Sequence, residues 1–69
     1  MEFNVHDLIA SSNRVDAWVS RGESQPSDED VVNAVSYRMR EWMRARTSGF
    51  DVLASNELDC IREILDAIE

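Results

Sequence analysis

The sequence predicts an all-α protein in which two or three amphipathic helices form a small bundle that is completed by homodimerisation. Apolar residues recur at three-four spacing along most of the chain, and capping residues stand where these segments begin and end. No stretch alternates with the period of two that a half-buried strand requires. We therefore expect a single helical domain over residues 1–69, with helices at about 5–21, 28–47 and 52–68 and a linker at 22–27.

The first helix is predicted from its start signal. Asn4 is a good capping residue, and Phe3 is placed to pack on Leu8 as a hydrophobic staple. Ser11-Ser12-Asn13 are weak helix formers, so we expect a kink or local fraying at these residues. The apolar seam of this helix follows the three-four spacing of a packed helix: Val5, Leu8, Ser12, Val15 and Val19.

The central helix has the clearest boundaries. Ser27 is its predicted N-cap, and Asp30, three residues later, is placed to reach back to the Ser27 amide. Pro26 prevents one continuous helix, and Gly49 is the expected stop. At about 100° per residue the helix has two faces. The apolar face holds Val31, Val32, Val35, Met39, Trp42 and Met43, and the polar face holds Tyr37, Arg40, Glu41 and Arg44.

The last helix has the most regular apolar pattern in the chain. Its start, after Asp51 or after Ser55, stays open at this point. Ile64 widens the seam, which consists of Ala54, Leu58, Ile61, Leu65 and Ile68. An acidic ridge is expected on the outer side: Asp59, Glu63 and Asp66.

Composition bounds the function. Fourteen acidic residues against seven basic ones give a net charge of −7, which disfavours direct nucleic-acid binding. No apolar run approaches the roughly 20 residues of a membrane span, and the N-terminus lacks the basic start of a secretory signal, so we expect a cytoplasmic protein without a membrane partner. A chain of this length buries a thin core. Because Cys60 is the single cysteine, no internal disulfide can form, and homodimerisation is the expected remedy.

The residues that catalysis requires are scarce, so we expect no enzyme, no cofactor and no metal site. His6 is the single histidine and is predicted to be exposed or adjacent to the cap. Cys60 is predicted to be a small core residue. Gly22 and Gly49 are isolated, so there is no glycine-rich phosphate loop.

Three surfaces remain as candidates. The predicted partner-binding face is Tyr37, Arg40, Glu41 and Arg44, because Tyr and Arg dominate interface hot spots. The predicted dimer or core set is Val35, Met39, Trp42, Met43, Leu58, Ile61, Leu65 and Ile68. The third is the acidic ridge, whose carboxylates at helical spacing would imitate a row of phosphates and occupy a basic channel. Whether the ridge or the Tyr37 face carries binding stays open.

Two resemblances bear on function. The stretch Ser55-Asn56-Glu57-Leu58-Asp59 resembles the Ser-x-Glu-Leu-Asp signature of small helical aspartyl-phosphate phosphatases that act on sporulation regulators. That resemblance implies Asp59 as the functional residue and a phosphorylated response regulator as the substrate.

In size, acidity and lack of catalytic residues, the chain also looks like small phage-encoded inhibitors such as anti-CRISPR proteins and quorum-sensing anti-activators. This second resemblance implies a protein that binds a host protein or complex and inhibits or regulates it by direct contact. We take this binding module as the leading hypothesis.

Overall fold

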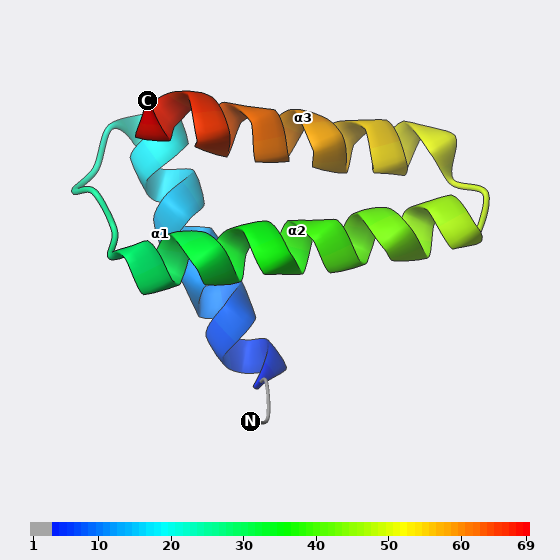
Figure 1. Ribbon diagram of the computed structural model, residues 1–69, viewed down its shortest axis with the longest axis horizontal. Helices are drawn as coiled ribbons and strands as arrows, with labels where there is room; N and C mark the ends of the chain where they lie inside the picture. The colour runs from blue at the N-terminus through cyan, green and yellow to red at the C-terminus, as the bar shows by residue number, and fades with distance from the viewer. Residues whose placement is uncertain (1–3) are drawn as a thin grey trace.

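The protein is an all-α bundle of three helices. Its structure, a computed structural model, describes residues 4–69, and the predicted Phe3 staple lies outside them. The helices are α1 (Val5–Arg21), α2 (Asp28–Thr47) and α3 (Asp51–Ile68). Helices α2 and α3 run antiparallel as a hairpin, and α1 crosses one side of that hairpin (Figure 1).

Side-chain caps begin the first two helices as the sequence predicts. The Asn4 side chain accepts from the His6 amide at 2.9 Å, and Ser27 Oγ accepts from the Asp30 amide at 3.2 Å. The last helix begins at Asp51, ahead of both predicted starts. Its N-cap residue, Phe50, makes no side-chain cap hydrogen bond.

Two glycines follow the C-terminal ends of α1 and α2. Gly22 (φ +67°) and Gly49 (φ +79°) adopt the left-handed conformation that other residues reach only at a cost. The chain between α2 and α3 is consequently short, and the two helices lie side by side over their lengths (Figure 1).

The core is small and takes one residue from each helix at its centre. Val15, Ala34 and Ile64 form its buried centre, one residue from each helix. Ala34 admits close approach because it has only a methyl group to place between α1 and α3. Ile64, which the pattern assigned to the margin of the seam, is the α3 side chain at the centre, with 2 % of its surface exposed.

The predicted kink at Ser11-Ser12-Asn13 is wrong. Helix α1 runs without interruption through these residues, and Ser11 and Ser12 are buried. Ser11 Oγ donates to Asp30 Oδ1 at 2.9 Å and accepts from Asn33 Nδ2 at 3.3 Å. These bonds to α2 satisfy the hydroxyl and compensate for the low helix propensity of serine.

Arg14 completes the contact between α1 and α2. Its guanidinium donates to both Asp30 oxygens, at 3.0 Å from Nε and at 2.7 Å from Nη2. The Asp30 carboxylate therefore turns toward α1, and the prediction that it reaches back to the Ser27 amide is wrong. Hydrogen bonds from Arg14 and then from Ser11 lower the pKa of Asp30 from 3.8 to about 2.

This pKa shift predicts an acid-dependent loss of stability. The folded-state pKa of Asp30 lies below its unfolded value, so the contact contributes stability above about pH 4 and loses it as the pH falls toward 2. We expect the Tm of Asp30→Asn to fall less between pH 4 and pH 2 than the Tm of the wild type, measured by circular dichroism. Asp28→Asn removes the same charge from the same turn and is the matched control. Equal slopes in wild type and Asp30→Asn would contradict the assignment.

Candidate interaction surfaces

A half-buried arginine, Arg38, connects all three helices. Arg38 Nη2 on α2 lies 2.7 Å from Asp16 Oδ2 on α1, and Nη1 lies 3.3 Å from Glu57 Oε1 on α3. The side chains of Arg38 and Glu57 are 19 % and 18 % exposed, so the cluster is largely screened from water. Burial opposes the charge on Arg38, but Asp16 and Glu57 outweigh burial and raise its pKa.

The contacts of Asp30, Asn33 and Arg38 show which side of α2 faces the other two helices. Asp30 and Asn33 contact Ser11 of α1, while Arg38 reaches both neighbouring helices. The most buried line along α2 is therefore centred on the small residue Ala34, on Arg38 and on the other buried alanine, Ala45. This line does not include the large apolar residues of α2. The side chains buried in the bundle are those that allow the helices to pack closely or to form ion pairs.

Most of the predicted dimer or core set lies at the surface of the chain. Residues that succeed one another in a helix are turned by about 100°, so Val35, Met39 and Trp42 lie on the α3 side of α2, away from α1. By the same rotation Leu58 and Leu65 lie on the flank of α3 that adjoins them. We call this surface the hairpin face, and it consists of Val32, Val35, Met39, Trp42, Met43, Leu58, Ile61, Leu65 and Ile68.

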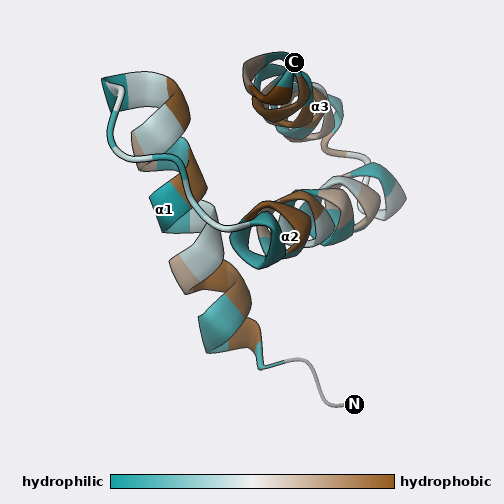
Figure 2. Ribbon diagram, turned by 60° about the vertical axis from the view of Figure 1, so that its left-hand side comes forward, coloured by the Kyte–Doolittle hydropathy of each residue, from teal (hydrophilic) through white to brown (hydrophobic). Residues whose placement is uncertain are grey.

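The hairpin face is exposed along its length. Met39 and Leu65 each expose 50 % of their surface, while Val35, Trp42 and Ile61 are half-buried. These residues therefore do not form the centre of the chain's own core, and their role in a dimer remains a prediction. Figure 2 shows hydrophobic bands on both helices of the hairpin.

The Tyr37 face lies on the α1 side of the hairpin. Tyr37 and Glu41 are half-buried, whereas Arg40 and Arg44 are exposed. The guanidinium carbon of Arg38 lies 5.9 Å from the centre of the Tyr37 ring. Glu41 pairs with Arg44, with 3.6 Å between Oε1 and Nη1.

The sequence pattern missed a cleft next to this face. A hollow of about 240 Å³ lies between the end of α2 and the start of α3. Phe50 and Leu53 supply its apolar wall, and both are more than half exposed. We call it the loop cleft; it is lined by Glu41, Arg44, Ala45, Ser48, Phe50, Leu53 and Glu57. Aromatic Phe50 directly after Gly49 was the available signal for it.

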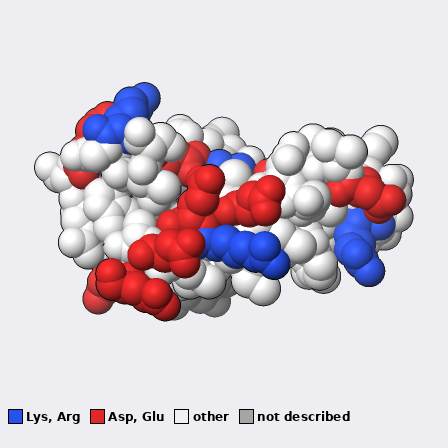
Figure 3. All heavy atoms as spheres, turned by 90° about the horizontal axis from the view of Figure 1, so that it is seen from above, with Lys and Arg blue, Asp and Glu red and all other residues white. Residues whose placement is uncertain are grey.

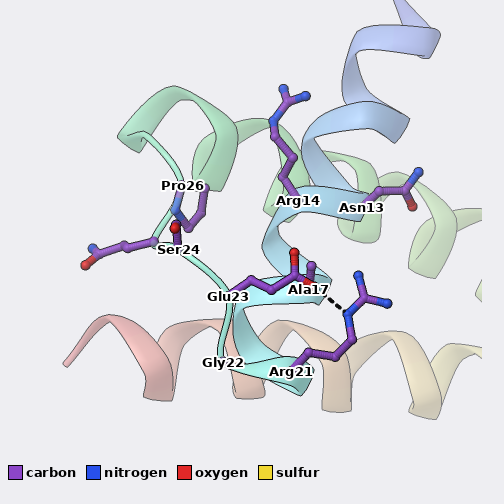
Figure 4. A pocket seen from close by; sticks show the side chains of 9 residues that line it. Asn13, Arg14, Ala17, Arg21, Gly22, Glu23, Ser24 and Pro26 are labelled. Atoms are coloured by element: carbon purple, nitrogen blue, oxygen red, sulfur yellow. Dashed lines mark hydrogen bonds and ion pairs between the residues drawn. The ribbon is translucent and has the colours of Figure 1, made fainter.

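A larger and more open hollow, of about 760 Å³, adjoins the connection between α1 and α2. Arg14 and Arg21 line it together with the linker, and Figure 4 shows Glu23 reaching toward Arg21. Arg21 Nε lies 2.7 Å from Glu23 Oε2, and Arg14 is bound to Asp30. Its basic groups are thus already engaged within the chain, so this hollow is a weaker candidate for a binding site.

The acidic ridge lies on the outer side of α3. Asp59, Glu63 and Asp66 are all exposed. Figure 3 shows acidic side chains gathered over this side of the molecule with basic side chains among them. Asp59, the residue implied by the phosphatase resemblance, is part of this open surface and does not line the loop cleft.

The structure also shows where the single histidine and the single cysteine lie. His6 is exposed in the first turn of α1, beside the Asn4 cap. Cys60 is half-buried on α3, and burial raises the pKa of its thiol although Arg38 opposes that shift. Among residues 4–69, no group of three or more His, Cys, Asp or Glu side chains is placed to hold a metal ion.

Comparison of the chain with protein-family models, with curated proteins and with solved structures gives no match. Within residues 4–69, no helix combines the length and the apolarity needed to cross a bilayer.

Proposed function

We propose that the protein is a non-enzymatic binding module that regulates a larger protein by direct contact, with inhibition of a host protein or complex as its mode of action. The observation that carries the proposal is the loop cleft, where exposed Phe50 and Leu53 adjoin the charged pair Glu41 and Arg44. An apolar pocket with a charged rim suits the anchor side chain of a partner.

The chemistry of the partner follows from the cleft and from the charge of the chain. Phe50 and Leu53 fit one large apolar side chain, and Arg44, whose side chain is 79 % exposed, is free to rearrange around the segment that carries it. The net charge of −7 and the acidic ridge favour approach of a basic surface. The proposed target therefore presents an apolar anchor within a basic surface.

Tyr37 and Arg40 extend the contact along α2. Tyr37 lies one turn before Glu41 and Arg40 one turn before Arg44, so both adjoin the cleft on the same side of the helix. Half-buried Tyr37 adds contact area at low entropic cost, because its ring is already held against Arg38. The face that the sequence singles out and the cleft thus form one continuous surface.

A charge placed in the cleft should abolish binding without unfolding the protein. Leu53 occupies the third position of α3, where glutamate is favourable for the helix start. We expect Leu53→Glu to weaken binding at least tenfold, which corresponds to about 1.4 kcal/mol. Affinity capture from extracts of the native host identifies the bound protein, and titration with that purified protein gives the Kd.

The matched control is Val52→Glu. Val52 is 75 % exposed, lies next to Leu53 and does not line the cleft. This variant should bind within about twofold of the wild type, as expected for a surface substitution away from the contact. The double variant Tyr37→Ala/Arg44→Ala should lose binding and keep its helical content. Equal binding by Leu53→Glu and Val52→Glu, or retained binding by the double variant, would refute the proposed surface.

A further inference from the structure

We infer that the hairpin face pairs with the hairpin face of a second copy, with α2 packed antiparallel against α2 of that copy. This surface lies on the side of the hairpin opposite α1, whereas the loop cleft lies on the α1 side, so the inference is independent of the proposed function. The dimer then leaves both loop clefts open to their targets.

The first argument is the thin core of the single chain. The largest completely buried side chains among the described residues are Ile64, Val15 and Ser11, and one of these is polar. Single domains of this size usually need a disulfide, a metal or a partner chain to complete their stability. With a single cysteine, Cys60, no internal disulfide can form. A partner chain on the hairpin face, where Met39, Leu65 and Ile68 are each 50 % exposed, supplies the missing burial.

The second argument is the spacing of the residues that make up the hairpin face. Along α2 they continue the series Val32, Val35, Met39 and Trp42, which is the four-three alternation of a coiled-coil seam. Leu58, Ile61, Leu65 and Ile68 repeat this alternation on α3. Val35 packs against the chain's own core, so this period also serves the contact between α2 and α3, and its exposed members, Met39, Leu58 and Leu65, are left for a second copy.

The third argument is area. From Asp28 to Arg46 the seam of α2 extends about 27 Å, at about 1.5 Å per residue. Two helices side by side are about 22 Å wide, so each copy offers about 600 Å² and a dimer buries about 1,200 Å². That area exceeds the roughly 1,000 Å² expected of a biological interface and falls at the lower end of the standard size.

The charges at the two ends of the face decide the arrangement. Asp28 and Arg46 extend the α2 seam by one step at each end, and the Arg46 guanidinium carbon lies 5.9 Å from the Trp42 ring centre. Because α3 runs antiparallel to α2, the end of α3 that carries Glu69 lies at the same end of the hairpin as the start of α2 (Figure 1). The face therefore has an acidic end and an end where Arg46 offsets Asp51, the first residue of α3.

Only one of the two face-to-face twofold arrangements matches these charges. A twofold axis across the helices places Asp28 of each copy opposite Arg46 of the other. An axis along the helices places the acidic ends of both copies together, and like charges in contact are unfavourable. The interface is isologous, so each favourable pair occurs twice.

The first test is the oligomeric state. Sedimentation equilibrium should show a reversible dimer of the wild type with a Kd below about 100 µM. Met39→Glu buries a charge from each copy in the interface and should weaken the dimer at least tenfold while circular dichroism shows unchanged helical content. Val52→Glu, the same change outside the face, should leave the Kd within about twofold. A wild type that stays monomeric at about 100 µM, or a dimer that Met39→Glu does not weaken, overturns the inference.

A mixing experiment tests the antiparallel arrangement. Asp28→Arg alone places two arginine pairs in its dimer, and Arg46→Asp alone places two aspartate pairs. When the two variants are mixed, Asp28 of one faces Arg46 of the other, and the two introduced residues face each other with opposite charges. Native mass spectrometry should show the mixed dimer several-fold above its statistical share. A statistical distribution overturns this arrangement. A folding defect of one variant would affect its own dimer and the mixed dimer alike, so it cannot account for the result.

Discussion

Replacing Ile64 with alanine is expected to lower the free energy of unfolding by about 3 kcal/mol, whereas Leu65→Ala should lower it by less than about 1 kcal/mol. The two neighbours on α3 differ in burial: Ile64 is 2 % exposed and Leu65 is 50 % exposed. Removing the Ile64 side chain leaves a cavity between Val15 and Ala34, where all three helices meet. In a chain of this length the total stability is roughly 3–10 kcal/mol, so Ile64→Ala approaches complete unfolding.

Chemical denaturation followed by circular dichroism measures this difference. The protein should be at a concentration well below the Kd of any dimer, because self-association adds an apparent stability that depends on concentration. Under that condition Leu65→Ala reports only on the single chain. Equal losses for the two variants would mean that Leu65 is part of the core of the chain and that the hairpin face is not free.

Replacing Arg38 with methionine is expected to cost about 2–3 kcal/mol of unfolding free energy. The substitution keeps much of the side-chain volume but leaves the largely buried Glu57 carboxylate without its cation, next to Asp16. This expected loss is smaller than that for a fully buried ion pair. The Asp16 side chain is 42 % exposed, so water screens its interaction with Arg38.

The control and the rescue for Arg38 come from the same region of the chain. Arg40→Met makes the same change at an exposed position of α2 and should alter stability by less than about 0.5 kcal/mol. The double variant Arg38→Met/Glu57→Leu removes both buried charges and should recover most of the loss, because apolar groups can replace a buried ion pair at little cost. Failure of the double variant to recover stability would show that the loss is one of packing and not of charge.

The local structure was predictable because it depends on neighbouring residues. Asn4 and Ser27 cap their helices within two or three residues along the chain, and Gly22 and Gly49 end them. The all-α class was predicted correctly for the same reason. Helix α3 begins at Asp51 without a side-chain cap, so its start had no comparable local signal.

The rotation of α2 was not predictable from its apolar pattern. Met39 and Met43 are larger and more apolar than Ala34 and Ala45, yet the alanines are buried and the methionines are exposed. An apolar seam shows that a helix packs against something, but it does not show whether the neighbour belongs to the same chain. The position of Arg38 between Asp16 and Glu57 depends on how three helices meet, and no local signal describes that.

The Tyr37 face and the loop cleft also differ in how far the sequence reveals them. Tyr37 and Arg44 were identifiable because a tyrosine on a polar helix face is unusual in sequence. Phe50 and Leu53 join them only because the turn at Gly49 brings the start of α3 beside the end of α2. The loop cleft is thus a property of the hairpin and not of either helix.

The central claim is that the α2–α3 hairpin has two separate surfaces, one for a second copy and one for a target. Methyl NMR of the protein labelled at methionine and leucine tests it most directly, because Met39 and Leu65 report on the hairpin face and Leu53 reports on the loop cleft. Raising the protein concentration should shift the Met39 and Leu65 methyl signals and leave Leu53 in place, and adding the captured target should shift Leu53. A Leu53 signal that moves with concentration while Met39 and Leu65 stay fixed would contradict the assignment of the two surfaces.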